Sequence, residues 1–166
     1  MTDQSSWEND LKDTDGSCRD VNLSEHLSRE AALALLDAIS TEWMLHSAAN
    51  GDGSTASPSN FSALVGIGEG SLSTLWSGGS LIKQLQCYLY WNPGDGVFSE
   101  LTFFTDDIIE DRFSLQRFTT FLSNLLAITH STEYYVRYEN ASWRHGDASS
   151  QSGVIFSHHD LPLGGG

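Results

Sequence analysis

The residue types in this sequence that could bind a metal or transfer protons gather near its C-terminal end. They are His145 and Asp147, followed by His158, His159 and Asp160. Histidine nitrogens and carboxylates are common zinc ligands. Adjacent histidines on a strand point to opposite faces, however, so at most one of His158 and His159 can join His145. Too few ligands then remain for a closed site, and we expect surface or capping histidines, with no metal and no other cofactor.

The sequence contains no strong signature of an enzyme. Neither Cys18 nor Cys87 has a histidine or another base close by in the sequence, and the many serines include no G-x-S-x-G motif. The glycines of residues 66–70 (GIGEG) lack the spacing of a dinucleotide-binding loop, and no convincing helical pattern follows them. We therefore predict neither nucleophilic catalysis nor nucleotide binding.

A run of carboxylates, Asp106, Asp107, Glu110 and Asp111, is a candidate binding surface. It precedes a helical pattern, and the helix dipole favours each carboxylate near a helix N-terminus by roughly 0.3 to 1 kcal/mol. The run can thus be a solvated helix start or a contact surface for a basic partner. Taken alone, charge runs are more often solvated.

A second group of residues favours the contact surface. Tyr135, Trp143, Arg144 and His145 lie on or just after a predicted strand of the same structural unit. Trp, Tyr and Arg are the residue types that most often anchor interfaces. We predict that this group and the four carboxylates together contact the partner, with a core position for Trp143 as the alternative.

The elements that position these residues are clearest in the middle of the chain. Apolar and polar residues alternate over residues 81–91 and 97–104, and the intervening NPGDG run has the proline and glycines of a turn, which predicts a β-hairpin. Apolar residues three and four apart predict a helix from Ser114 to about His130. Alternation returns over residues 134–138, which predicts a third strand.

Further elements are predicted on either side. Residues 28 to about 47 have the apolar stripe of a helix, and the Gly, Ser and Asp-rich residues 50–60 read as a loop. A short strand is predicted over residues 61–69, and a last strand around Val154 and Phe156. Residues 72–76 fit a helical turn or a strand equally well.

These patterns predict an α+β fold. We expect an antiparallel sheet of about four to six strands with two main helices packed on one face, because the apolar stripes of the helices need a sheet to cover. With 166 residues the chain has the size of one domain. We assign residues 1–23 to a mobile acidic tail, 24–163 to a single α+β domain and 164–166 to a disordered glycine end.

Charge limits the partners that the chain can have. It carries 22 Asp and Glu against 8 Lys and Arg, a net charge of −14, which disfavours nucleic acids and anionic membranes and favours a protein with a basic surface. No run of about 20 apolar residues and no signal-peptide pattern occurs. We therefore expect a cytoplasmic protein.

The order of these elements resembles that of a known class of protein. A helix, a short VGIG strand, the hairpin, the TFFTDDI corner, a second helix and the YYVRYE strand, in a small acidic chain, resemble the immunity proteins of bacterial polymorphic-toxin systems. The resemblance implies a non-enzymatic protein that binds and occludes a cognate toxin domain, such as a nuclease or deaminase. The alternatives are another acidic binding protein, such as a nucleic-acid mimic or adaptor, and a small His/Asp-based enzyme.

Overall fold

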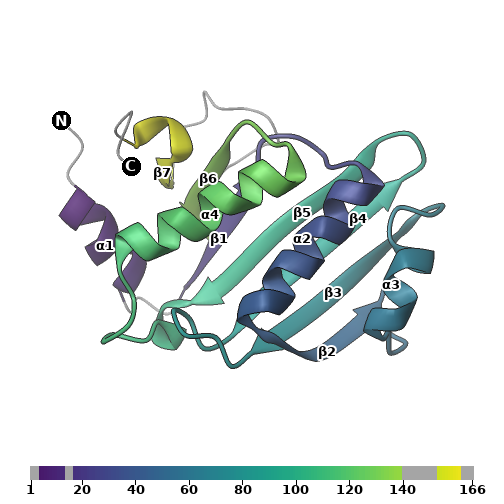
Figure 1. Cartoon of the computed structure of the whole chain (residues 1–166), viewed down its shortest axis with the longest axis horizontal. Coiled ribbons are helices and arrows are strands. Elements are labelled where there is room, and N and C mark those ends of the chain that lie inside the picture. Colours follow the sequence, from purple (N-terminus) through teal and green to yellow (C-terminus); the bar gives the residue numbers. More distant parts are fainter. Residues whose placement is uncertain (1–3, 14–16, 140–152, 162–166) are drawn as a thin grey trace.

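The computed structural model describes residues 4–13, 17–139 and 153–161 (Figure 1). Over these residues the elements follow one another in the order α1 (Gln4–Lys12), β1 (Cys18–Leu23), α2 (Arg29–Glu42), β2 (Met44–Asn50), α3 (Pro58–Leu64), β3 (Gly70–Ser77), β4 (Leu85–Asn92), β5 (Gly96–Phe104), the 3-10 helix η1 (Thr105–Asp107), α4 (Leu115–Thr129), β6 (Tyr134–Tyr138), β7 (Val154–Ser157) and the 3-10 helix η2 (His158–Asp160). The predicted glycine end, 164–166, lies outside the described residues.

The strands form one antiparallel sheet in the order β2-β3-β4-β5-β1-β6-β7, and α2 and α4 lie side by side on one of its faces (Figure 1). The α+β class and the two main helices on one face are confirmed. Seven strands exceed the predicted four to six, because β1 and β2 come from segments that were predicted as a tail and as the end of a helix. Buried Leu35 and Ile39 of α2 and Phe118 and Leu122 of α4 meet the apolar side of the sheet.

The prediction of a mobile tail over residues 1–23 is wrong for β1 and α1. Every residue of β1 is buried, and Val21 lies opposite Leu101 of β5 on one side and Val136 of β6 on the other. Strand β1 was not predicted from the sequence because charged Arg19 and Asp20 interrupt its short apolar alternation. Arg19 is fully buried, with its guanidinium 4.7 Å from the centre of the Tyr138 ring.

Helix α1 is held to the opposite end of the chain. Its Trp7 is buried and stacks on Phe156 of β7, with ring centroids 4.9 Å apart, and Leu11 is fully buried. The carbonyl oxygen of Asp10 accepts two hydrogen bonds from Arg19, at 3.1 and 2.9 Å. The N-terminal segment therefore contributes a helix and an interior strand to the fold.

One boundary and one element type also differ from prediction. The first helix ends at Glu42, because Trp43 is extended and buried, and residues up to Asn50 pair with β3. Residues 61–64, predicted as the start of a strand over residues 61–69, instead belong to helix α3. Pro58 stands in its first turn, and Phe61 and Val65 are buried four residues apart, a helical spacing within an apparent alternation.

The predicted β-hairpin and the helix that follows it are confirmed. β4 and β5 pair as a hairpin in which Trp91 lies opposite Val97, although β4 begins at Leu85 rather than at residue 81. α4 begins after Ser114, whose hydroxyl accepts from the backbone N–H of Arg117 at 3.1 Å, and ends where His130 adopts a left-handed backbone with φ of 58°.

Gly79 permits the closest contact in the loop before β4. The Trp43 indole donates to the carbonyl oxygen of Ile82 at 2.7 Å, and a Cβ on Gly79 would lie 2.0 Å from that indole nitrogen and 2.3 Å from that oxygen. We expect Gly79→Ala to lower the free energy of unfolding by about 2 to 4 kcal/mol, through overpacking and a lost buried hydrogen bond. Urea unfolding would measure this.

A double-mutant cycle tests the cause. In a Trp43→Phe background the Gly79→Ala change should cost clearly less than in the parent, because phenylalanine has no indole nitrogen at this point. Equal costs in the two backgrounds would show that the contact with Trp43 is not responsible.

Candidate functional site

The four predicted carboxylates lie together in the structure, in a segment that we call the acidic corner (Asp106, Asp107, Glu110 and Asp111). Asp106 and Asp107 belong to η1, directly after β5, and the segment is tied to the loop before β4. The backbone N–H of Lys83 donates to the carbonyl of Asp107 at 2.7 Å, and that of Ile109 to Leu81 at 3.0 Å. The corner is not the start of α4, whose first turn contains no acidic residue, so the helix dipole does not explain it.

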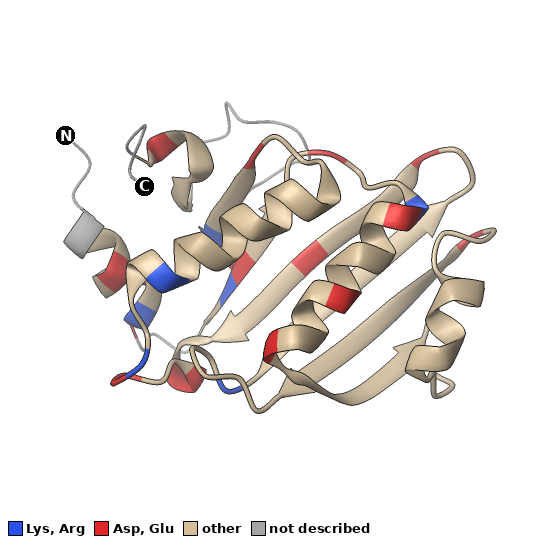
Figure 2. Ribbon diagram, viewed as in Figure 1, with Lys and Arg blue, Asp and Glu red and all other residues tan. Residues whose placement is uncertain are grey.

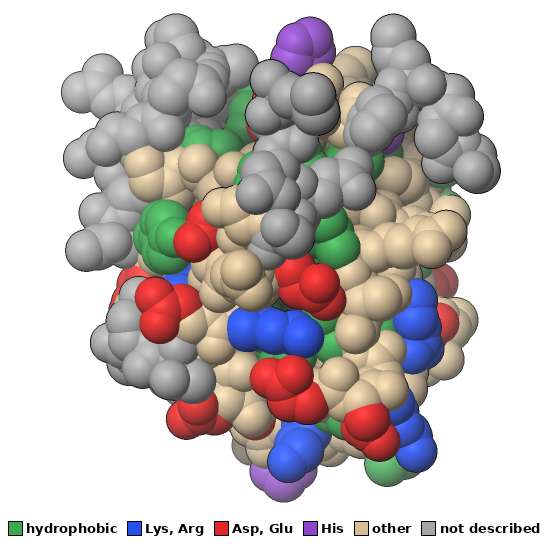
Figure 3. All heavy atoms as spheres, turned by 90° about the vertical axis from the view of Figure 1, so that its left-hand side faces the viewer, with side chains coloured by type: hydrophobic (Ala, Val, Ile, Leu, Met, Phe, Trp, Pro, Cys, Tyr) green, Lys and Arg blue, Asp and Glu red, His purple; other side chains and the backbone are tan. Residues whose placement is uncertain are grey.

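The acidic corner is mostly exposed and is partly neutralised by neighbouring cations. Lys12 of α1 reaches the Glu110 carboxylate at 3.2 Å, and Figure 3 shows acidic side chains around basic ones at this end of the molecule. Burial raises the pKa of Asp107, and Asp106 adds to this while Lys83 opposes it. An exposed ion pair such as Lys12–Glu110 contributes at most about 1 kcal/mol. The corner can attract a cationic surface, but it is not uniformly negative.

Of the residues predicted to anchor the partner beside this corner, the structure describes only Tyr135. Tyr135 is only 7% exposed and stands in β6 between Asn22 of β1 and Ser157 of β7, so its ring is not available as an exposed anchor in this structure. Trp143, Arg144 and His145 lie outside the described residues.

His158 and His159 lie in η2 rather than in a strand. The Asp160 carboxylate accepts from the backbone N–H of Ser157 at 2.9 Å and so caps this short helix. His159 is exposed, and its backbone N–H donates to Glu133 at 2.9 Å. The part of the chain that the structure describes contains no group of three His, Cys, Asp or Glu residues placed to hold a metal ion, and His145 and Asp147 lie outside that part.

A buried polar network that the sequence did not reveal joins β1, β5 and β6. Its centre is Arg137, which donates from Nε to Asn22 Oδ1 at 2.7 Å and from Nη2 to Glu100 Oε2 at 2.8 Å, and lies 3.4 Å from Asp20 Oδ2. Thr102 also donates to Asp20, at 2.7 Å. The available signal was the alternation of polar Asp20 and Asn22 with Val21 and Leu23, which only strand pairing makes meaningful.

The pKa of the Asp20 carboxyl is raised in this network. Burial raises the pKa of its carboxyl, the hydrogen bond from Thr102 lowers it, Glu100 raises it and Arg137 lowers it. Asp20 and Glu100 share the single guanidinium of Arg137, which offsets the repulsion between the two carboxyl groups.

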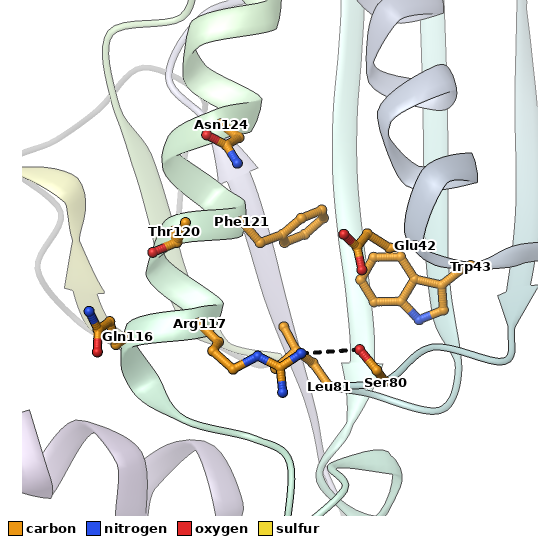
Figure 4. A pocket seen from close by; sticks show the side chains of 9 residues that line it. All are labelled: Glu42, Trp43, Ser80, Leu81, Gln116, Arg117, Thr120, Phe121 and Asn124. Atoms are coloured by element: carbon orange, nitrogen blue, oxygen red, sulfur yellow. Dashed lines mark hydrogen bonds between the residues drawn. The ribbon is translucent and has the colours of Figure 1, made fainter.

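A pocket of about 290 Å³ lies between α2 and α4 (Figure 4). Trp43, Leu81 and Phe121 form its apolar part, and Glu42, Ser80 and Arg117 are among its polar residues. Arg117 donates to the carbonyl of Arg112 at 2.6 Å and to Ser80 Oγ at 3.3 Å, so this cation already ties α4 to the loops around it. Arg117 and Ser80 thus have a structural role in this pocket.

Comparison with known proteins adds one finding. No protein-family model matches the sequence, and no curated protein matches it. Among solved structures, the chain is similar to one chain of the crystal structure of the toxic C-terminal tip of CdiA from Pseudomonas aeruginosa in complex with its immune protein, with a TM-score of 0.62 and 16% identity over 89% of this chain and 97% of that chain. This chain therefore shares its fold with one chain of that complex.

At 16% identity this likeness concerns the fold. It agrees with the resemblance to immunity proteins that the order of the predicted elements indicated. Within the described residues, no helix is both long and apolar enough to span a membrane.

Proposed function

We propose that this chain is a non-enzymatic immunity protein, which binds a cognate bacterial toxin domain in the cytoplasm and occludes it. The observation that carries the proposal is the fold shared with one chain of a complex between a CdiA toxic tip and its immune protein, across nearly the whole length of both chains. The net charge of −14 supports a protein partner with a basic surface.

Charge also supports the mode of inhibition. A toxin that acts on nucleic acid, such as a nuclease or a deaminase, needs a basic cleft for its substrate. An acidic chain complements such a cleft and is steered toward it at long range. Binding across the cleft would exclude the substrate without any chemical step.

The decisive experiment uses the toxin domain encoded beside this gene. A large secreted protein with a variable C-terminal domain directly upstream is expected, and that C-terminal domain would be expressed in a bacterial host with and without this chain. The toxin domain alone should arrest growth, this chain alone should be harmless, and the pair should grow and purify as a complex. Growth arrest by this chain alone would make it the toxic component and refute the proposal.

The acidic corner should speed association. We expect that Asp106→Asn, Asp107→Asn, Glu110→Gln and Asp111→Asn together lower the association rate constant by on the order of tenfold at low salt, because they remove four charges that attract the toxin domain. At about 1 M salt, where the screening length is about 3 Å, the deficit should disappear. Stopped-flow binding at several salt concentrations measures both.

A control variant removes charge elsewhere. Glu30→Gln, Asp37→Asn and Glu42→Gln change three exposed carboxylates of α2 to amides. If this variant slows association as much as the corner variant does, net charge rather than the corner steers the partner.

A further inference from the structure

Half of the sheet is built from strands without charged side chains. β2, β3 and β4 contain no Lys, Arg, Asp or Glu, and β5 contains only Glu100, although the chain has 30 such residues (Figure 2). One face of these strands meets the core, where Cys87, Leu89 and Trp91 of β4 are buried. The absence of charged side chains is expected on the core face, but a surface with Glu100 as its single charged residue is unusual on the other face.

That other face, away from α2 and α4, carries exposed aromatic rings. Tyr88 is 38% exposed, Tyr90 is 41% exposed and Phe104 is 45% exposed. Tyr88 and Tyr90 alternate with the buried residues of β4 and therefore point to the side of the sheet opposite the helices. We call this side of β3, β4 and β5, with Ser73, Tyr88, Tyr90 and Phe104, the open face.

The pairing register makes the open face continuous. Tyr88 lies between Ser73 of β3 and Glu100 of β5, and Tyr90 lies between Ser71 and Phe98. Aromatic rings with charged residues depleted are typical of the centre of a protein–protein interface, and tyrosine beside serine is typical of antibody binding loops. Tyrosine is well suited to this because it supplies a large contact area while losing few rotatable bonds.

Carboxylates lie at both ends of the open face. At one end, exposed Asp106 of the acidic corner follows Phe104 by two residues. At the other, where β4 ends and β3 and β5 begin, stand exposed Asp52, Glu69 and Asp95. A partner that covers the rings therefore meets negative charge at its edges.

We propose that the open face is the surface that binds the toxin domain, by contact with an apolar patch that Lys and Arg side chains surround. This inference rests on the proposed function and identifies the binding surface. Charge selects a toxin domain over a second copy of this chain, because two copies would bring together surfaces of the same sign, each on a protein of net charge −14. In this proposal Tyr88 and Tyr90 replace the buried Tyr135 as the aromatic anchors.

The first test removes the rings. Tyr88→Ala combined with Tyr90→Ala should weaken binding of the toxin domain on the order of 100-fold or more and raise the dissociation rate at every salt concentration, as loss of central anchors does. Ile128→Ala on α4 is the matched control, since Ile128 is also 38% exposed but lies on a helix on the other side of the sheet. It should bind as the parent does. Thermal unfolding shows that each variant is folded.

A second pair of variants tests the charge of the partner without removing any ring. Ser73 is exposed and lies directly opposite Tyr88. Ser73→Lys should weaken binding by on the order of tenfold because it repels a basic surface, whereas Ser73→Glu should bind as tightly as the parent or more tightly. Equal losses in both variants would contradict a basic partner.

The outcomes separate this inference from the proposed function. If the parent neutralises and binds the toxin domain but folded open-face variants bind it equally well, the open face is not the interface and the immunity function stands. If the parent does not bind the toxin domain at all, the proposed function and this surface assignment both fall. Dimerisation of the parent that the Tyr88 and Tyr90 changes abolish would identify a second copy as the occupant and overturn the proposal.

Discussion

A chain that lacks residues 1–23 is expected not to fold. β1 stands between β5 and β6 in the sheet, so its removal separates the four strands β2 to β5 from β6 and β7 and leaves backbone groups unpaired on both sides of the gap. The truncation also removes Val21 and Leu23 and exposes the apolar side chains that they cover. The burial of each of these two residues contributes roughly 1.5 to 3 kcal/mol to the free energy of unfolding. Together with the unpaired backbone groups, each of which costs roughly 1 to 3 kcal/mol when buried, this loss exceeds the stability of a typical domain, about 5 to 15 kcal/mol.

Circular dichroism and thermal unfolding of the truncated chain measure this effect. A synthetic peptide of residues 1–23, added to the truncated chain during refolding, provides the control, because it supplies the missing strand and α1 in trans and should restore a cooperative transition. A truncated chain that unfolds cooperatively near the melting temperature of the parent would show that this segment is a dispensable tail after all.

The Arg137→Met variant is expected to lose about 3 to 5 kcal/mol of unfolding free energy at neutral pH. Removing one partner of a buried ionic group leaves the others uncompensated, and here Asp20 and Glu100 would face each other without the guanidinium that joins them. Methionine keeps much of the length and volume of the side chain, so the loss reports the charge and the hydrogen bonds. Arg112→Met, at an exposed position, should change stability by no more than about 0.5 kcal/mol.

The loss should depend on pH in a defined direction. Burial already raises the pKa of Asp20 above its ordinary value of 3.8, and removal of Arg137 takes away a charge that lowers it. A carboxyl whose pKa is higher in the folded state than in the unfolded state destabilises the fold increasingly as pH rises through the interval between the two values.

The difference between parent and variant should therefore be smallest below pH 3.8 and largest at neutral pH. Urea unfolding at several pH values measures this difference. A loss that is the same at acidic and neutral pH would mean that packing, and not charge, determines the role of Arg137.

This network also bears on the open face. Glu100 lies directly opposite Tyr88, and its carboxylate accepts from both Arg137 and Asn22. β1, β5 and β6 are thus locked together beside the exposed rings. Arg137→Met would weaken binding of the toxin domain through loss of the folded state, whereas Tyr88→Ala removes a contact from a folded surface. Binding measured on the folded fraction distinguishes the two.

The sequence by itself determined the elements whose side-chain pattern agrees with their backbone needs. β4 and β5 were predictable because apolar and polar residues alternate across an NPGDG turn, and α4 because its apolar residues recur three and four apart behind the Ser114 cap. Composition gave the acidic net charge, and the order of these elements gave the α+β class. Such patterns are local, and one segment suffices to read them.

Only the tertiary structure decided the rest, because the deciding partners are distant in sequence. β1 is a strand through its pairing with β5 and β6, about 80 and 115 residues away. Thr102 of β5 and Arg137 of β6 also contact the buried carboxylate of Asp20. Residues 44–50, predicted as the end of a helix, instead pair with β3 as strand β2. Tyr135, predicted to contact the partner, is buried. The open face likewise exists only once three strands lie side by side, since single strands place Tyr88, Ser73 and Phe104 far apart in the chain. Long-range strand pairing, which sets which side of each strand meets the helices, fixed both the core and the surface proposed to bind the toxin.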